Sequence, residues 1–442
     1  MPRRLALHIL KRVERDRAYA NILLRERLSA SHLSRPDRAL VTELVYGTLR
    51  WRGKIDYILS RHSKLPIKRL SRDILNILRL GAYQLLWLQR VPPFAIIDEA
   101  VEMAKEKGGQ GAGRFINGVL RAIQRDGGQV DPPDINYDPV GHISALYSQP
   151  DWLIRSWIEQ YGLDRAIEFA KAFNERPPLT LRVNRLKVSR DELLKELKAR
   201  PCAFSPEGIR VSGLTELEGL DPFRRGLFSI QDEGAQLVSH LLAPEPGERV
   251  LDACAAPGGK ATHMASLMNN KGMIIALDVN HARLRLVASE AERLGIDIIK
   301  PLLADATKLL PFKPPGRGPG FHKVLIDAPC TGSGVIRRHP EGKWHQPNIP
   351  SLVALQKTLL LNLSRYLKVG GILVYSVCST DRREGEEVME AFLKEENRFR
   401  LDPNLPNFMK GAVETIEAGA YRTWPTMGGM DAFYMARLKR VK

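Results

Sequence analysis

The sequence has few cysteines and no long apolar run. It contains 4 Cys in 442 residues, without the close Cys/His pairs of a zinc site or the density of a disulfide framework. No segment approaches the roughly 18 consecutive apolar residues of a membrane-spanning helix. The first apolar run stops at Leu10, which is too short for a secretion signal. We therefore expect a reduced, cytoplasmic protein without a membrane segment or a bound metal.

The composition excludes disordered and fibrous classes of protein. Hydrophobic residues make up 44% of the chain and charged residues 26%, which is ordinary for globular domains with full-sized cores. A length of 442 residues favours about three domains.

Positive charge is concentrated at one end of the chain. The net charge is +17, of which residues 1–130 carry 25 Lys/Arg against 12 Asp/Glu (+13) and the rest 42 against 38 (+4). Such a basic block indicates a polyanionic partner, most simply nucleic acid. A basic domain without such a partner is the alternative. Crowding of basic residues in one short span, opposed only by Asp73, favours nucleic acid: Lys64, Lys68, Arg69, Arg72 and Arg79.

Hydrophobic periodicity divides the chain into three parts. Residues 1–127 have helical spacing throughout, interrupted by Gly and Pro, and predict about seven short helices. Glycine and proline pairs over 127–133 then predict a linker. We place an all-α domain at 1–130, a small α+β domain at 140–226 and an α/β domain at 227–442. Within the middle part we expect helices at 152–173 and 190–198 and strands at 179–183 and 208–211. From about Phe228 to the end, strands and helices alternate, as in a doubly wound parallel sheet.

Four acidic residues follow apolar, strand-like segments of the last domain. They are Asp252, Asp278, Asp305 and Asp327. Ligands of open α/β sheets bind outside the carboxyl ends of the strands, so these carboxylates should meet in one crevice. Each acid alone is equally well explained as a helix N-cap. Four acids that each follow a strand-like segment at the spacing of one strand–helix unit are harder to explain in that way.

The loop after the first of these strands lacks a phosphate-binding pattern. It reads Cys254, Ala255, Ala256, Pro257, Gly258, Gly259, Lys260. A Walker loop and a dinucleotide fingerprint both fail here, because their glycine spacing is absent. A nucleoside cofactor without phosphates fits better: Asp278 would take ribose hydroxyls and Asp305 the adenine amino group, with the other acids near a positive charge. S-adenosylmethionine has those three features.

Two cysteines follow strands at the same edge of the sheet. Cys330 follows Asp327, and Cys378 ends the next strand. A lone Cys is usually a small buried hydrophobe, but a thiolate that adds to C6 of cytosine makes C5 nucleophilic enough to accept a methyl group. A second thiol would assist release, and Asp327 would hold the N3/N4 edge of the base. Lys260 would lower a thiol pKa, or is merely a surface residue at a helix start.

These motifs resemble the Sun/Fmu family of RNA 5-methylcytosine methyltransferases over nearly the whole chain. The matching runs are 252–260, 327–330 and 376–379, with further matches at 180–184, 231–236 and 431–434. The N-terminal part resembles the RNA-binding antitermination factor NusB at 44–47, 77–81, 98–101 and 115–121. A NusB-like domain ahead of this catalytic domain is the layout of the bacterial members that methylate small-subunit ribosomal RNA. Val377 and Ala432 stand where the family usually has Thr and Gly, and neither change removes a reacting group.

The resemblance implies a Rossmann-like methyltransferase domain and a division of labour between the thiols. Cys378 would be the nucleophile and Cys330 would assist product release, with the loop 254–260, Asp278, Asp305 and Asp327 lining the S-adenosylmethionine site. Cys330 as nucleophile is the mechanistic rival, because DNA cytosine methyltransferases attack with a Pro-Cys cysteine. We expect a monomer that acts on a cytosine in 16S ribosomal RNA, free or in an assembly intermediate. Transfer RNA as substrate, methylation of a base nitrogen, and a non-catalytic antitermination-like factor are the other hypotheses.

Overall fold

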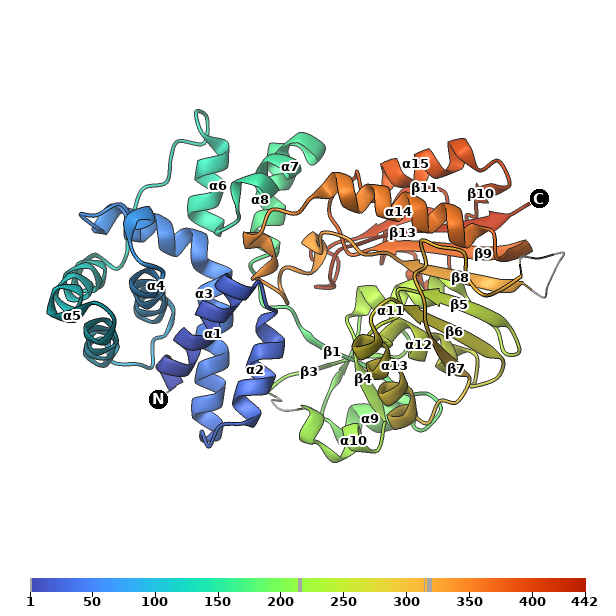
Figure 1. Ribbon diagram of the computed structural model, residues 1–442, viewed down its shortest axis with the longest axis horizontal. Coiled ribbons are helices and arrows are strands. Elements are labelled where there is room, and N and C mark those ends of the chain that lie inside the picture. The colour runs from blue at the N-terminus through green and yellow to red at the C-terminus, as the bar shows by residue number, and fades with distance from the viewer. Residues whose placement is uncertain (1, 214–216, 314, 316–319) are drawn as a thin grey trace. The chain divides into compact units, whose positions relative to one another are not determined.

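The chain folds into two compact units, shown in Figure 1. The computed structural model describes residues 2–213, 217–313, 315 and 320–442. A helical unit comprises Met1–Arg176 and Ile336–Gln346, and a sheet unit comprises Pro177–Val335 and Pro347–Lys442. In the part of the chain that the structure describes, no helix is both long and apolar enough to cross a membrane.

Capping residues explain where the long helices of the helical unit begin and end. Helix α3 starts after Ser34, whose hydroxyl accepts a hydrogen bond from the Asp37 backbone N–H, which satisfies one free donor of the first turn. Helix α5 ends at Gly127, which adopts the left-handed conformation of a C-cap. The helices are α1 (Pro2–Asp16), α2 (Ala20–Ser29), α3 (Arg35–His62), α4 (Arg72–Trp87), α5 (Pro93–Asp126), α6 (Pro139–Tyr147), α7 (Asp151–Tyr161) and α8 (Leu163–Ala172).

One sequence prediction about these helices is confirmed and one is wrong. The described part of residues 1–127 contains α1 to α5 and one 3-10 helix (Ile67–Arg69). Gly108 and Gly109 have non-helical torsion angles and divide α5 into two helices across a kink, so the segment holds about the seven helices expected. Conversely, the helix expected over 152–173 is divided into α7 and α8 at Gly162, which has a φ of +82°.

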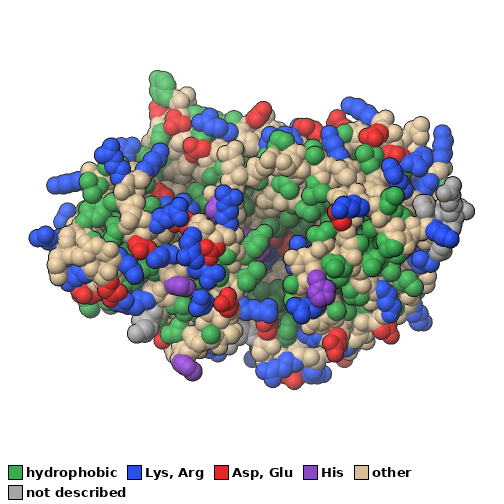
Figure 2. All heavy atoms as spheres, in the orientation of Figure 1, with side chains coloured by type: hydrophobic (Ala, Val, Ile, Leu, Met, Phe, Trp, Pro, Cys, Tyr) green, Lys and Arg blue, Asp and Glu red, His purple; other side chains and the backbone are tan. Residues whose placement is uncertain are grey.

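The basic cluster of the sequence is only partly a surface feature. Lys64, Lys68, Arg69 and Arg72 are exposed, and Figure 2 shows Lys and Arg side chains projecting from this unit. Arg79 is only 4% exposed: its guanidinium donates to both carboxylate oxygens of Asp56 at 2.7 Å. Arg79 therefore stabilises the helix core and does not belong to the exposed basic cluster.

One segment of the helical unit comes from a distant part of the sequence. Residues Ile336–Gln346 belong to this unit, where the Trp344 indole N–H donates to the Leu49 carbonyl at 2.7 Å. The Lys343 ammonium is buried and donates to the carbonyls of Arg50 and Ser148 at 3.0 and 2.7 Å. Burial lowers the pKa of Lys343 well below its usual value. These contacts hold the segment within the helical packing.

The sheet unit begins with a small antiparallel sheet. Its strands are β1 (Leu179–Val183), β2 (Arg200–Pro201), β3 (Gly208–Val211) and β4 (Phe228–Ile230), in the order β2-β3-β1-β4. The strands expected at 179–183 and 208–211 are confirmed. Helix α9 (Arg190–Glu196) follows a capping box between Ser189 and Glu192, which stabilises its first turn. Shorter helical turns are η2 (Leu217–Gly219) and α10 (Asp221–Arg224).

A larger mixed sheet forms the rest of this unit. Its described strands run in the order β11-β12-β13-β9-β8-β5-β6-β7, with β10 paired to β13. They are β5 (Arg249–Ala253), β6 (Met273–Asp278), β7 (Ile299–Leu303), β8 (Phe321–Asp327), β9 (Leu367–Val377), β10 (Phe399–Leu401), β11 (Glu414–Glu417), β12 (Ala420–Thr423) and β13 (Phe433–Arg440). Strands β5 to β9 are parallel, as predicted. The expectation of alternation to the end is wrong, because β10 to β13 pair in antiparallel fashion.

Helices cover both faces of the parallel strands. Alternate residues of β8 point to opposite cores: Leu325 packs with one apolar cluster, and Val324 and Ile326 pack with the other, as the period of two requires. Apolar residues of α11 (Glu233–Leu242), α12 (Gly259–Leu267) and α13 (His281–Leu294) belong to the first cluster, and those of α14 (Ile349–Ser364) and α15 (Glu386–Glu395) belong to the second. In open α/β sheets, ligands bind outside the carboxyl ends of such strands.

Candidate active site

The two cysteines expected at the sheet edge meet there. Strands β8 and β9 are parallel neighbours with Asp327 opposite Ser376, so the loops that follow them lie side by side. This register brings Cys330 Sγ within 3.4 Å of Cys378 Sγ. The hydrogen bond to Cys378, together with burial, raises the pKa of the Cys330 thiol well above its usual value. Cys330 is therefore a protonated thiol at neutral pH.

An ammonium group lies in the same site. Lys260 Nζ forms an ion pair with Asp327 Oδ2 at 2.7 Å, and the Ser376 hydroxyl donates to Asp327 Oδ1 at 2.7 Å. Burial opposes the charge on Lys260, but the Asp327 carboxylate raises its pKa above the usual value. The ammonium also lies 5.2 Å from the centre of the Phe433 ring, a cation–π distance. Lys260 thus places a fixed positive charge in the site.

The loop before α12 turns sharply at the end of β5. Cys254 has a φ of +62° and Gly258 a φ of +107°, and the Ala255 N–H donates to the Leu277 carbonyl at 2.7 Å. A Cβ on Gly258 would lie 3.1 Å from the Val287 backbone. Glycine is therefore required for both the torsion angle and the close approach. The loop 254–260 thereby lies against the end of β6, beside the predicted cofactor acids.

The four acids differ in environment. Asp278 is 5% exposed and accepts a hydrogen bond from the Asn280 N–H at 2.8 Å. Asp305 lies beyond the end of β7 and accepts from the Thr307 hydroxyl at 2.6 Å, a contact that lowers its pKa. Asp327 pairs with Lys260 as described. These three expected site residues all lie at or just after the carboxyl ends of parallel strands, but Asp305 is also bound in its own turn.

Asp252 is the acid without a protein partner. It is fully buried, and neither of its carboxylate oxygens has a hydrogen-bond partner among the described residues. Burial and the nearby Asp327 charge raise its pKa well above the usual value. A buried, unpaired acid at a strand end is costly unless a ligand uses it. Among the four acids, Asp252 is therefore the one whose burial the described protein groups do not offset.

Arg182 supports the cofactor loop, and the sequence analysis assigned it no role. It lies on β1 and is fully buried, and burial lowers its pKa to about 10. Its guanidinium donates to the Gly259 carbonyl and, at 2.9 Å, to the Thr262 hydroxyl. The run 180–184 resembled the family's pattern, but only the fold shows that this arginine holds the first turn of α12.

Three buried side chains with metal-ligand chemistry were also missed. Ligand atoms of Glu207, His240 and His263 lie within 4.8 Å of one another. Glu207 is already engaged, because Oε2 lies 2.7 Å from His240 Nε2 and Oε1 lies 2.9 Å from Arg185 Nη1. The residues are far apart in sequence, on α11, on α12 and before β3, so no local motif signals them. In this arrangement they connect the small sheet to the helices of the large one.

Comparison with known proteins agrees with this architecture. Residues 239–439 match the 16S rRNA methyltransferase RsmB/F family. Probable ribosomal RNA small subunit methyltransferase B of Bacillus subtilis is 37% identical over 99% of this chain and 98% of its own length. The chain belongs to the RsmB/F family. Ribosomal RNA small subunit methyltransferase B of Pseudomonas syringae is 36% identical over 100% of this chain and 97% of its own.

The other parts of the chain also have relatives. Residues 1–125 match the NusB family, and residues 149–218 match the ferredoxin-like domain of RsmF/B-like methyltransferases. The crystal structure of PH0851, 27% identical, has a TM-score of 0.82 and covers 100% of this chain and 99% of its own. The family resemblance is confirmed. So is the predicted fold class: a NusB-like helical domain, an α+β middle domain and a Rossmann-like methyltransferase domain.

Proposed function

We propose that this protein transfers the methyl group of S-adenosylmethionine to C5 of a cytosine in 16S ribosomal RNA through a covalent Cys378–C6 adduct. The observation that carries this proposal is the pair of thiols 3.4 Å apart, beside a partly exposed Lys–Asp ion pair. Methylation of a base nitrogen has no use for two adjacent thiols, because a nitrogen lone pair accepts a methyl group without covalent activation.

The crevice suits S-adenosylmethionine, which supplies a methyl group on a positively charged sulfur. Asp278, at the end of β6, would bind the ribose hydroxyls, and Asp305 the adenine amino group. The backbone of 254–260 would pack against the rest of the molecule. The unpartnered Asp252 supports this assignment, since a nearby cation favours a carboxylate that burial and Asp327 otherwise disfavour.

The two thiols would act at different steps. The Cys378 thiolate bonds to C6, and the electron pair of the C5–C6 double bond makes C5 nucleophilic toward the methyl group. After C5 is methylated, a solvent base takes the C5 proton, the electron pair of that C–H bond restores the C5–C6 double bond, and the sulfur–C6 bond breaks with its electron pair leaving on the Cys378 sulfur. Cys330 stays protonated because its pKa is raised, so it can donate a hydrogen bond to the departing sulfur.

Lys260 and Asp327 would assist the base. The Lys260 ammonium favours negative charge near it, on the attacking thiolate and on the pyrimidine after attack. Asp327 would accept from the N4 amino group or a protonated N3, since each of its oxygens has a second acceptor position beyond the contacts with Lys260 and Ser376. The target base must be unstacked to reach these groups.

Ribosomal RNA is the proposed partner, in the cytoplasm and with the enzyme as a monomer. The NusB-like domain carries the exposed Lys64, Lys68, Arg69 and Arg72, which supports electrostatic binding of RNA phosphates. No metal is needed for any of these steps.

Labelled methyl transfer tests the function. The protein is incubated with methyl-tritiated S-adenosylmethionine and either 16S ribosomal RNA or total transfer RNA, followed by digestion to nucleosides. We expect label in 5-methylcytidine from the ribosomal RNA, and none when Cys378→Ala is used. Label on a cytosine nitrogen, or in transfer RNA alone, would contradict the proposal.

A further inference from the structure

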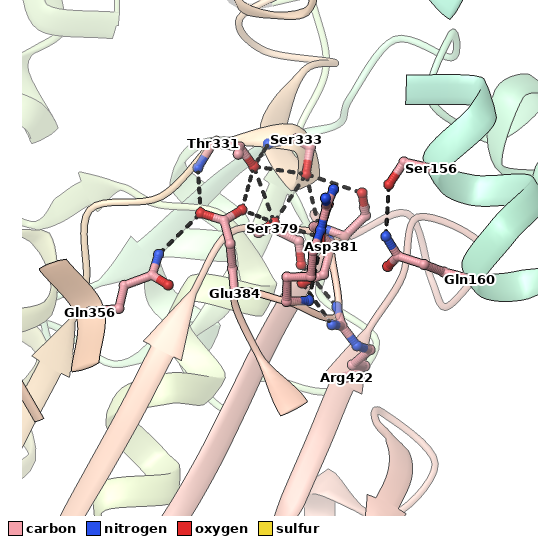
Figure 3. Close-up of polar contacts among 11 residues, drawn as sticks. Ser156, Gln160, Thr331, Ser333, Gln356, Ser379, Asp381, Glu384 and Arg422 are labelled. Atoms are coloured by element: carbon pink, nitrogen blue, oxygen red, sulfur yellow. Dashed lines mark hydrogen bonds and ion pairs between the residues drawn. The ribbon is translucent and has the colours of Figure 1, made fainter. Parts of the chain in front are cut away.

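A buried carboxylate connects the two loops that carry the thiols. Glu384 lies in the turn that precedes α15 and has no exposed surface. Thr331 follows Cys330 directly, and Ser379 follows Cys378 directly. Figure 3 shows both of these residues directed toward the Glu384 carboxylate.

Glu384 accepts four hydrogen bonds from three elements. Its Oε1 accepts from the Thr331 backbone N–H and the Gln356 amide, both at 3.0 Å. Its Oε2 accepts from the Thr331 hydroxyl at 2.7 Å and the Ser379 hydroxyl at 2.5 Å. A carboxylate with two oxygens offers about four acceptor positions, so the donors saturate it. Among the described residues, no Lys or Arg forms an ion pair with it, so its partners are these donors.

Two further hydrogen bonds hold the loops that carry the thiols. The Gln356 amide also donates to the Pro329 carbonyl at 2.9 Å, which attaches α14 to the residue before Cys330. The Gly334 N–H donates to the Cys378 carbonyl at 3.0 Å. Every one of these contacts lies within one or a few residues of a thiol, and none contacts a sulfur. The network therefore acts on the position of the thiols rather than on their chemistry.

We propose that Glu384 is a positioning residue that holds the Cys330 and Cys378 loops in register and thereby keeps the two thiols in contact. The inference rests on the proposed two-thiol reaction for its catalytic consequence. Glu384 would contact neither the RNA nor the cofactor. Its loss would remove the shared acceptor of four interior donors, and the Thr331 and Ser379 hydroxyls would keep each other and the Ser333 hydroxyl within hydrogen-bond distance. The loops would separate to satisfy the remaining donors with water.

The first test measures thiol contact without RNA. The rate at which iodoacetamide alkylates Cys330 is measured as a function of pH by peptide mass spectrometry. The measurement is made in the wild-type protein and in Cys378→Ala. Because Cys330 is hydrogen-bonded to Cys378, removal of Cys378 should shift the Cys330 profile to lower pH. In a Glu384→Ala background, the same removal should leave the profile unchanged. An equal shift in both backgrounds would overturn the proposal.

The second test measures catalysis. Glu384→Ala should lower kcat by about 100-fold, as expected when a reacting group is misplaced by about 1 Å, while KM for RNA stays within about twofold. Glu384→Gln keeps the shape but turns one acceptor oxygen into a donor, so kcat should fall by about tenfold. If Glu384→Ala does not fold, Glu384→Gln decides, and an unchanged kcat in that variant would refute the role.

A matched control separates positioning from stability. Asp402 is another buried carboxylate of the sheet unit, paired with Arg437 at 2.8 Å. Asp402→Asn should lower thermal stability without changing the Cys330 profile. If the thiol contact depends on Glu384 but the protein makes no 5-methylcytidine, the positioning role is supported and the proposed function is refuted. If the protein methylates normally and neither Glu384 variant has an effect, the proposed function is supported and the positioning role is refuted.

Discussion

The two units of this protein use charged side chains in opposite ways. In the helical unit, four cations stand exposed near the start of α4: Lys64, Lys68, Arg69 and Arg72. In the sheet unit, Asp252 is buried, and Lys260 and Asp327 are only partly exposed at the end of a parallel sheet. Exposed charges act over a Debye length and are screened by salt, whereas buried ones act at contact. Single substitutions should therefore be severe in the second region and mild in the first.

The largest effect is expected at Lys260, the cation paired with Asp327. Lys260→Met keeps most of the aliphatic stem but removes the charge beside Asp327. Loss of a preorganised electrostatic group should lower kcat by about 100- to 1,000-fold, with RNA affinity unchanged. Single-turnover methylation measures this. If the rate stays within about threefold of wild type, the Lys260–Asp327 ion pair is structural only, and the comparison between the units is wrong.

A smaller effect is expected at the exposed cluster. Replacing Lys64, Lys68, Arg69 and Arg72 together by Gln should weaken RNA binding by about tenfold and make its salt dependence shallower. kcat at saturating RNA should be unchanged. Filter binding across salt concentrations measures both quantities. Lys394 and Arg400 are exposed cations of the sheet unit, and their replacement by Gln is the control. An equal loss in the control would remove any special role for the helical unit.

The smallest effect is expected on stability against acid. Burial lowers the pKa of His263 to about 3. Between pH 6.5 and pH 3 the unfolded state therefore binds more protons, and the free energy of unfolding falls as the pH falls. Burial raises the pKa of Glu207, but contacts with His240 and His263 lower it by more, so the net pKa is below its usual value. Below the usual pKa of a glutamate, the free energy of unfolding therefore falls further as the pH falls.

Urea unfolding at pH 7 and pH 5 measures this loss. His263 should contribute about 2 kcal/mol of destabilisation between the two pH values. In His263→Met the group is absent. Neither ring nitrogen has a hydrogen-bond partner among the described residues, although Nε2 lies 3.9 Å from Glu207 Oε2. The pH dependence of the variant should be shallower by that amount. Parallel curves for the two proteins would show that His263 takes up its proton in the folded state.

The sequence predicted that the strand-end acids and the two cysteines lie at one edge of the sheet, because the signals for that placement are local. Apolar strands followed by Asp278 and Asp327, and cysteines after adjacent strands, place these groups at one edge by the topology of parallel sheets alone. Glu384 and Arg182 depend on tertiary contacts across 53 and 77 positions, to Thr331 and Gly259, so no short pattern reveals them. The burial of Arg79 was missed for the same reason, since its partner Asp56 lies on another helix.

The break within α5 was predictable because its signal is also local. Gly108 and Gly109 have non-helical torsion angles, and a glycine pair is a strong local signal for a helix break. The single helix expected over 152–173 was wrong, because the chain turns at Gly162, which has a φ of +82°.

Covalent trapping tests the central claim most directly. Wild-type, Cys330→Ala and Cys378→Ala proteins are incubated with 16S ribosomal RNA and S-adenosylmethionine and run on denaturing gels. If Cys378 attacks C6 and Cys330 assists release, Cys330→Ala will accumulate protein bound to RNA and Cys378→Ala will show none. An adduct that persists in Cys378→Ala and disappears in Cys330→Ala would contradict this account of the two thiols.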